Sequence, residues 1–262
     1  ELSPMVGDEQ PMVLLDTETT GLSADDESII ELGMVKVLYS PSAKRIVSIV
    51  DVISLYEDPG KPIPELITEL TGITDDMVQG QHIDDSLVAS WLSDDPLVVA
   101  HNAQFDRPFF EKRFAALGHL SWACSASGID WKALGFESRK LEYLLLRLGW
   151  FYEGHRAATD CLAMAWLFYL LPESVANLLS EADRRTVLVR AFGAPFDVKD
   201  YLKERGYRWH DGVKGANKHW WREISEDELP QEQTYLDDLY HRGSEHAHYD
   251  YKDARNRFKA LS

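Results

Sequence analysis

The sequence predicts an α/β layer fold that carries a small α+β appendage at its C-terminal end. Three segments rich in apolar and β-branched residues come first, within residues 11–56. Strand-like and helix-like segments then alternate up to residue 171, which is the order expected for helices packed on a sheet. After Pro172 the strongly acidic character of the chain ends, which indicates a separate unit.

The first three segments predict a meander of strands. Residues 11–16 form an apolar run that ends in Asp16, which is typical of a buried strand. Residues 29–39 and 45–56 are β-branched and partly alternate between apolar and polar side chains. The Ser-Pro-Ser sequence at 40–42 predicts a turn between them.

Helices and one further strand are expected after the meander. Pro64 predicts the first turn of a short helix, and Gly72 predicts its end. Residues 97–100 (LVVA) predict another buried strand, and the amphipathic segment after it ends at Gly118. The other expected helices comprise residues 86–92, 106–117, 140–148 and 157–171.

The C-terminal part is expected to divide into a linker and a small unit. Residues 174–190 are expected to be helical and to link the two parts. A helix over 198–205 and strands over 207–210 and 219–224 predict an α+β unit. The expected organisation is residues 1–172, a linker region at 173–194, and a small domain with a solvated tail at 195–262.

The composition excludes several classes of protein. With 45% hydrophobic and 27% charged residues, the chain is expected to be globular. No apolar run approaches the roughly 18 residues needed to span a bilayer. The first ten residues lack the regions of a signal peptide, so a cytoplasmic location without a membrane partner is expected. Cys124 and Cys161 are too few for a disulfide scaffold or a closed zinc site.

The negative charge is unevenly distributed. The net charge is −17, and residues 1–172 hold 12 Lys and Arg against 27 Asp and Glu. Residues 173–262 are nearly balanced, with 15 basic and 17 acidic residues. Because a nucleic-acid duplex is a polyanion, this charge argues against extended contact between a duplex and the first part.

Acidic residues follow two predicted strands, and one lies in a helix. Asp16 and Glu18 are two apart at a strand end, so both point to one side, although a solvated surface pair has the same spacing. Asp106 follows the strand at 97–100, where α/β folds bind ligands, although a helix N-cap is an equal alternative. Asp160 lies in an otherwise apolar helix, where an acid must be exposed, paired or bound to metal.

His155 adds an imidazole five residues before Asp160, although a lone histidine in a loop is commonly solvent-facing. Acids from three distant segments suit hard divalent cations such as Mg²⁺. Two such ions can hold the attacking and leaving oxygens of a phosphoryl displacement, while a histidine takes the proton from the attacking water. The constellation therefore predicts metal-assisted phosphodiester hydrolysis.

Three motifs in these segments resemble the DEDDh 3′–5′ exonucleases, the DnaQ-like branch of the RNase H-like superfamily. They are DTETTGL at 16–22, HNAQFD at 101–106 and HRAATD at 155–160, in the family order within residues 10–172. Arg156 stands where the sister group has tyrosine, which favours the histidine branch. The resemblance implies an RNase H-like mixed sheet, in which a three-strand meander and two parallel strands are flanked by helices.

The same resemblance implies the roles of site residues. Four acids would bind two Mg²⁺ or Mn²⁺ ions, with Asp16 bridging them, and a histidine would be the general base. These catalytic residues are Asp16, Glu18, Asp106, Asp160 and His155. The implied substrate-binding residues are Thr17, Thr19, Leu22, Asn102 and Phe105. Of these, Thr19 and Leu22 would lie against the terminal nucleotide and its 3′-OH.

The implied activity is a two-metal-ion 3′–5′ exonuclease of the bacterial cytoplasm. It would hydrolyse 3′ ends of single-stranded or frayed DNA and release nucleoside 5′-monophosphates. An exoribonuclease of the same fold is an alternative, because two-metal chemistry does not discriminate the sugar. A non-catalytic binding or assembly subunit is another. The expected partner is a nucleic acid with a 3′ end, single-stranded DNA being favoured, and a homodimer is compatible with the sequence.

The resemblance does not extend to the C-terminal part, where basic and aromatic residues interleave. Residues 195–224 hold seven basic residues, including Lys214. Single-strand binding stacks bases on rings and pairs phosphates with cations, although tryptophans could equally form the core of so small a unit. His241, His246 and His248 fit no zinc pattern and are expected in the solvated tail. The residues predicted to contact nucleic acid are Arg208, Trp209, Lys218, Trp220 and Trp221.

Overall fold

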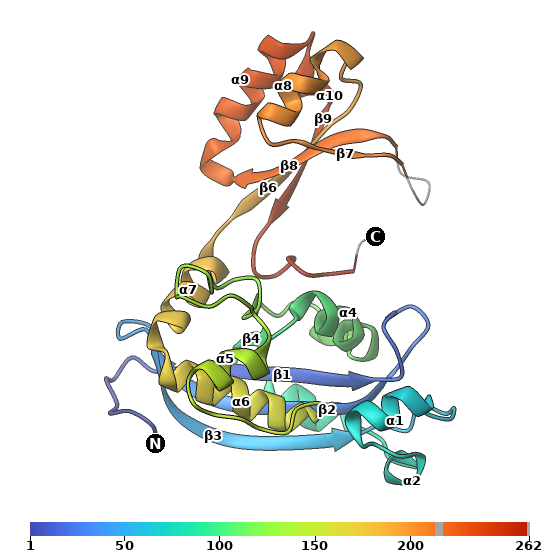
Figure 1. Ribbon diagram of the computed structural model, residues 1–262, viewed down its shortest axis with the longest axis vertical. Coiled ribbons are helices and arrows are strands. Elements are labelled where there is room, and N and C mark those ends of the chain that lie inside the picture. Colours follow the sequence, from blue (N-terminus) through green and yellow to red (C-terminus); the bar gives the residue numbers. More distant parts are fainter. Residues whose placement is uncertain (213–216, 261–262) are drawn as a thin grey trace. The chain divides into compact units, whose positions relative to one another are not determined.

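The computed structural model describes residues 1–212 and 217–260, so Lys214 lies outside the described residues. The chain divides into two compact units. One unit comprises Glu1–Ala182 and Ala254–Ser262, and the other comprises Asp183–Asp253. Each unit has its own sheet and its own apolar core (Figure 1).

The first unit is built on a mixed sheet with the strand order β3-β2-β1-β4-β5. The meander consists of β1 (Gln10–Thr19), β2 (Ile29–Ser40) and β3 (Arg45–Tyr56), which pair antiparallel. β4 (Leu97–Ala100) pairs in parallel with β1, and β5 (Trp122–Cys124) pairs in parallel with β4. A meander with two parallel strands confirms the RNase H-like mixed sheet.

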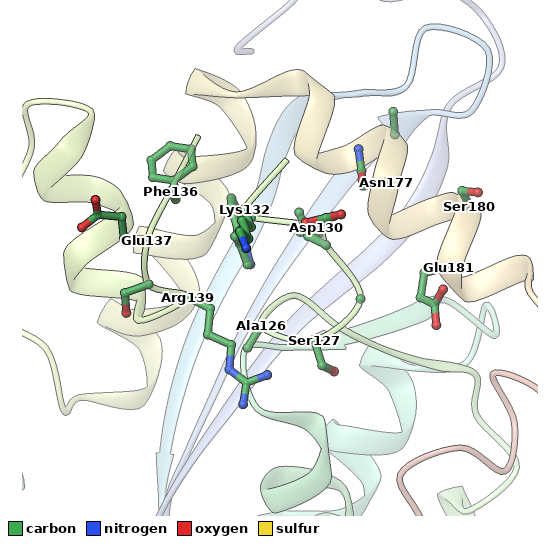
Figure 2. A pocket seen from close by; sticks show the side chains of 15 residues that line it. Ala126, Ser127, Asp130, Lys132, Phe136, Glu137, Arg139, Asn177, Ser180 and Glu181 are labelled. Carbon is green, nitrogen blue, oxygen red and sulfur yellow. The ribbon is translucent and has the colours of Figure 1, made fainter. Parts of the chain in front are cut away.

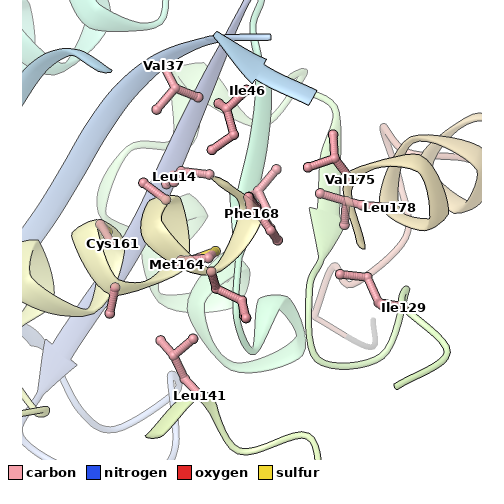
Figure 3. Packing of buried hydrophobic residues seen from close by; sticks show 14 of the residues in the cluster. Leu14, Val37, Ile46, Ile129, Leu141, Cys161, Met164, Phe168, Val175 and Leu178 are labelled. Carbon is pink, nitrogen blue, oxygen red and sulfur yellow. The ribbon is translucent and has the colours of Figure 1, made fainter. Parts of the chain in front are cut away.

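Helices cover both faces of this sheet (Figure 1). They are α1 (Glu65–Thr71), α2 (Asp75–Val78), α3 (Asp85–Trp91), α4 (Ala103–Arg113), α5 (Leu141–Arg147), α6 (Ala157–Leu170) and α7 (Pro172–Asp183). Met12 and Leu14 of β1 belong to the core cluster of α6, which Figure 3 shows. Val13 and Leu15 belong to the cluster of α4. β1 is apolar on both sides because both of its faces are buried.

One pair of these helices approaches the length and apolarity of a membrane span. Within residues 1–212 and 217–260, no single helix is long and apolar enough to cross a bilayer. α6 and α7 meet the requirement together, as a pair bent by 107°.

The chain between residues 173 and 194 differs from the expected linker. α7 ends at Asp183, and β6 (Thr186–Ala191) is a strand, so the expected helix over 174–190 is confirmed up to residue 183 and wrong beyond it. Val187 and Val189 alternate into the core of the second unit. This period of two is typical of a strand with one buried face, and it accounts for the strand conformation of the TVLVRA segment.

The second unit contains an antiparallel sheet with the order β7-β8-β6-β9. Its other strands are β7 (Arg208–His210), β8 (His219–Ser225) and β9 (Ala247–Lys252). Its helices are α8 (Lys199–Glu204), α9 (Leu229–Leu239) and α10 (Gly243–His246). The unit is α+β as expected. His241, His246 and His248 are exposed as expected, although residues 247–252 form a strand that pairs with β6.

The segment from Ala254 belongs to the first unit. Arg107 of α4 is fully buried and donates to the carbonyl oxygens of Ala254 at 3.1 Å and Arg257 at 2.7 Å. It also donates to the carbonyl of Arg255 and, through Nε, to Glu111 at 2.7 Å. A buried guanidinium needs such acceptors. A chain that ended at residue 182 would lack three of them.

Candidate metal centre

The period of two along β1 directs two carboxylates toward α6. Met12 and Leu14 face α6, so Asp16 and Glu18 at the next alternate positions face the same side. Asp160 comes from α6 itself. Ligand oxygens of the three carboxylates all lie within 4.8 Å of one another. The end of a strand and the helix facing it thus bring together three of the four predicted acids.

The close approach of α6 to the sheet depends on Gly33. This residue of β2 is the register partner of Asp16. A Cβ atom on Gly33 would lie 2.2 Å from the carbonyl carbon of Ala157, at the start of α6. Glycine is therefore required for the helix that carries Asp160 to reach the strand that carries Asp16.

The clustered carboxylates are shielded from water and repel one another. Burial and then the charges of Asp106 and Asp160 raise the pKa of Asp16 well above its usual range. Burial and the charge of Asp160 raise the pKa of Glu18 to about 8. Burial also raises the pKa of Asp160. A divalent cation would reverse this penalty, because it favours the charged form of each carboxylate.

Asp160 shows most directly that the residues fit a cation. Its Oδ1 is buried and has no hydrogen-bond partner among the described residues. Its Oδ2 accepts the backbone N–H of His155 at 3.1 Å. A buried carboxylate oxygen without a partner is costly, and carboxylate oxygens are the ligands that Mg²⁺ and Mn²⁺ prefer. The donor set therefore fits a hard divalent cation.

Asp106 lies beside these three carboxylates but outside the set within 4.8 Å. It is buried in the first turn of α4, and its Oδ1 accepts the backbone N–H of Thr17 at 3.1 Å and the Thr17 hydroxyl at 2.8 Å. Thr17 faces α4 because it alternates with Asp16 and Glu18 along β1. Burial raises the pKa of Asp106 to about 7. The fourth predicted ligand thus adjoins the cluster, with one oxygen held by a threonine.

His155 lies in the loop before α6, in the segment that contacts Asp160. Its backbone adopts the left-handed region at φ 64°, which is uncommon for a residue other than glycine. The side chain is 49% exposed, and its Nε2 lies 3.6 Å from Oε1 of Glu142 in α5. An accessible imidazole beside a carboxylate has the geometry of an oriented general base.

Glu31 is a functional candidate that none of the motifs indicates. It is 1% exposed in β2 and accepts hydrogen bonds from the hydroxyl of Ser54 at 2.6 Å and from Nε of Arg156 at 3.1 Å. It also accepts the backbone N–H of Ala157 at 3.2 Å. These bonds hold the start of α6 and the adjoining loop with His155. The only signal in the sequence is a single acid within the apolar run IIELGMV.

A cavity of about 940 Å³ in the first unit is separate from the carboxylates (Figure 2). It is lined by residues 126–132 and 136–139 and by α7. Arg139 and Lys132 lie among several acids there, which gives no consistent charge. Within the described part of the chain, its lining includes neither the four predicted acids nor the predicted base. The candidate chemistry therefore belongs to the carboxylate cluster.

The family model described as Exonuclease (RNase_T) matches residues 13–168, which include all four acids and His155. This match covers more than half of the chain. The chain belongs to the exonuclease family. The DnaQ-like, DEDDh resemblance of its motifs is thereby confirmed.

The exonuclease region is similar to parts of much longer proteins. It is 34% identical to the DNA polymerase III PolC-type protein of Bacillus subtilis over 180 residues, which are 65% of this chain and 12% of that protein. It is 41% identical to the PolC-type protein of Halalkalibacterium halodurans over 108 residues, 40% of this chain and 7% of that protein. The chain therefore spans a small fraction of the length of these relatives.

A solved structure has the same fold. It is the nuclease domain of 3′hExo, a DEDDh family member, bound to rAMP. The similarity has a TM-score of 0.50 at 18% sequence identity, and it covers 66% of this chain and 96% of that domain. At this identity the comparison supports the fold of the exonuclease domain.

The predicted substrate-binding residues of the exonuclease domain lie near the carboxyl ends of β1 and β4. Thr19 is buried and donates its hydroxyl to a backbone carbonyl at 2.7 Å. Leu22, in the turn after β1, is 88% exposed. Asn102 is the exposed N-cap residue of α4, so Asp106 is not the N-cap. Phe105 is partly buried, with its ring 5.0 Å from that of Phe109.

The five C-terminal residues predicted to contact nucleic acid lie outside the exonuclease match and are not on one surface. Trp220 is 8% exposed and belongs to the core of the second unit. Trp209 packs on it at 5.2 Å and is 50% exposed. Arg208 and Trp221 alternate to the opposite face of the sheet, with the guanidinium 5.5 Å from the ring. Lys218 is exposed just before β8.

Proposed function

We propose that this chain is a two-metal-ion 3′–5′ exonuclease that releases nucleoside 5′-monophosphates from single-stranded or frayed 3′ ends of DNA. The observation that carries the proposal is the cluster of Asp16, Glu18 and Asp160, with its unpaired buried oxygen, in a chain of the exonuclease family. These residues and Asp106 would hold two Mg²⁺ or Mn²⁺ ions. The proposal covers nuclease activity alone, because the chain matches 12% of the PolC-type relative.

When bound, the cations would supply electrophilic activation of the phosphate and a lower pKa for the attacking water. His155 accepts the proton of that water as its oxygen attacks the phosphorus of the last phosphodiester. The P–O3′ bond breaks, and its electron pair stays on O3′, which takes a proton and becomes the new 3′-OH. Glu142, whose Oε1 lies 3.6 Å from Nε2 of the imidazole, helps to orient His155.

The turn after β1 would contact the terminal nucleotide. Leu22 is exposed beside the carboxylates and offers an apolar surface to a base or sugar. Thr19 is fixed by its hydrogen bond in the same turn. DNA is proposed as the substrate because the relatives at 34% and 41% identity are DNA polymerase III proteins. No residue described above distinguishes the 2′ position, so RNA belongs in the test.

The test is a degradation assay on matched, end-labelled DNA and RNA, single-stranded and duplex, with Mg²⁺ or Mn²⁺. We expect stepwise shortening from the 3′ end with mononucleotide products. Asp160→Asn should be inactive, whereas Asp94→Asn, which removes the same charge from an exposed loop, should be fully active. Internal cleavage, or degradation by Asp160→Asn, would contradict the proposal. If RNA is cleaved faster than DNA, the proposed DNA substrate is wrong and RNA takes its place.

A further inference from the structure

The sheet of the second unit has one face covered by helices and one that no helix covers, considering residues 183–212 and 217–253 (Figure 1). Val187 and Val189 of β6 and Trp220 and Ile224 of β8 belong to one core cluster with residues of α8 and α9. Successive side chains along a strand point to opposite faces. The residues between these apolar positions therefore line the uncovered face.

A row of basic and aromatic side chains crosses this uncovered face. Arg208, Trp221, Arg190 and His248 are successive register partners on β7, β8, β6 and β9. The Arg208 guanidinium lies 5.5 Å from the Trp221 ring centroid. Arg190 and His248 lie 3.0 Å and 3.5 Å from carboxylate oxygens of Asp250, which fixes this end of the row.

A second aromatic group adjoins the row. His210 and His219 are register partners on β7 and β8 and stack with their ring centroids 4.9 Å apart and their planes at 18°. The acids on this face are engaged by neighbours: Glu223 accepts the Thr186 hydroxyl at 2.5 Å, and Asp250 pairs with Arg190. His219 is only 8% exposed and also packs against Phe192, so the ring and cation that this end of the face offers are Trp221 and Arg208.

We propose that this uncovered face binds single-stranded nucleic acid. Bases would stack on Trp221, and phosphates would contact Arg208 and Arg190. Open four-stranded sheets bind single strands through stacked bases, and any base can stack because each has a π-face. Arg208 favours this occupant, because it is exposed, pairs with no acid among the described residues, and lies over the Trp221 ring.

The proposal deepens the proposed exonuclease function and rests on it, because the bound strand is the substrate of the nuclease unit. It also changes the set of C-terminal residues that the sequence predicted to contact nucleic acid. Trp220 is excluded as a stacking platform by its burial, and Trp209 lies on the other face. Arg190 and His248 join Arg208 and Trp221, although they are distant in sequence, because β6 and β9 pair beside β8.

The test measures binding of labelled single-stranded DNA, single-stranded RNA and duplex DNA by fluorescence anisotropy in EDTA. Full-length protein with Asp16→Asn serves as the background, so that no cleavage occurs. Trp221→Leu should weaken single-strand binding by roughly 5- to 150-fold. Arg208→Glu should weaken it and reduce the slope of log affinity against log salt by about one or more. The matched controls, Trp209→Leu and Lys203→Glu on the other side of the sheet, should bind as the background does.

Melting temperatures of all variants establish that they fold, and Arg208 is exposed, so its variant tests the face even if Trp221→Leu is unstable. Unchanged binding by folded Arg208→Glu and Trp221→Leu would overturn the proposal, as would equal losses in the control variants. In active protein, Trp221→Leu should raise KM for a long single strand and leave dinucleotide hydrolysis unchanged. Failure of the exonuclease proposal gives a different result, namely intact binding by a protein that cleaves neither substrate.

Discussion

Replacing Asp16 by asparagine should abolish cleavage and also stabilise the metal-free protein. Its carboxylate lies within 4.8 Å of those of Glu18 and Asp160. Two unit charges about 4 Å apart repel by about 4 kcal/mol at an effective dielectric constant of 20. The metal-free protein avoids part of this repulsion by keeping protons, so the gain is smaller than the full value. We expect Asp16→Asn to raise the free energy of unfolding by about 1–3 kcal/mol at pH 8.

The stabilisation expected for Asp16→Asn should depend on pH. The pKa of Glu18 is raised from 4.5 to about 8, so the folded state holds protons that the unfolded state has released between these values. The free energy of unfolding of metal-free wild type therefore falls as the pH rises through this window. As the pH falls toward 3.8, the usual pKa of an aspartate, the carboxylates of the unfolded state also become protonated and the penalty shrinks. The advantage of Asp16→Asn should accordingly be small at pH 4.5 and grow toward pH 8.

The assay is thermal unfolding in EDTA across this pH range, repeated with saturating Mg²⁺. A gain of 1 kcal/mol corresponds to about 2–4 °C in Tm for a unit of this size. Mg²⁺ should stabilise wild type and have little effect on Asp16→Asn, while cleavage by the variant falls about 1000-fold or more. Asp94→Asn should behave as wild type in every condition. A gain for Asp16→Asn that is absent, or equal at pH 4.5 and pH 8, would refute the electrostatic account of the cluster.

Three further substitutions test the parts around the cluster. His155→Ala should lower kcat by about 10²–10⁴-fold, the usual contribution of a general base, while Mg²⁺ still raises the melting temperature; loss of that thermal response would exclude a purely catalytic role. Glu31→Gln should cost about 1–3 kcal/mol in unfolding free energy, because it weakens the hydrogen bonds to the Arg156 guanidinium, which is 39% exposed and remains partly solvated, and it should lower kcat more than it changes KM. Gly33→Ala should destabilise the protein by about 1–3 kcal/mol through overlap with Ala157, and a wild-type melting curve would show that α6 can shift.

The core of the first unit could be predicted because local pattern and tertiary environment agree there. The run PMVLL is apolar at every position, as a strand buried on both faces must be, and Asp16 follows it at the functional end. The period of two then places Glu18 with Asp16. The same period directs Thr17 to the opposite face, where its hydroxyl donates to Asp106. The sequence does not predict this contact, because it depends on where α4 and α6 pack against the sheet.

Other features depend on contacts between distant segments. Glu31 is indistinguishable in sequence from any acid in a strand until Arg156, 125 residues away, is seen beside it. Residues 184–190 were expected to continue a helix, but residues 186–191 pair with β8 and β9 and form a strand instead. No local sequence pattern predicts that the chain returns to the first unit at Ala254. The return is explained by buried Arg107, whose guanidinium donates to backbone carbonyls of that segment.

The net charge of −17 is compatible with a polyanionic substrate because the acids are not equivalent. Asp16, Glu18 and Asp160 form a cluster where bound divalent cations would invert the local sign, so that phosphate could approach the first unit there despite its acidity. Away from that point this unit repels a strand. The uncovered face of the second sheet offers a separate contact, in which stacking contributes and Arg208 supplies charge. The two proposals together place the substrate at the carboxylate cluster and at the uncovered face of the second sheet. Salt should then weaken binding mainly at the uncovered face.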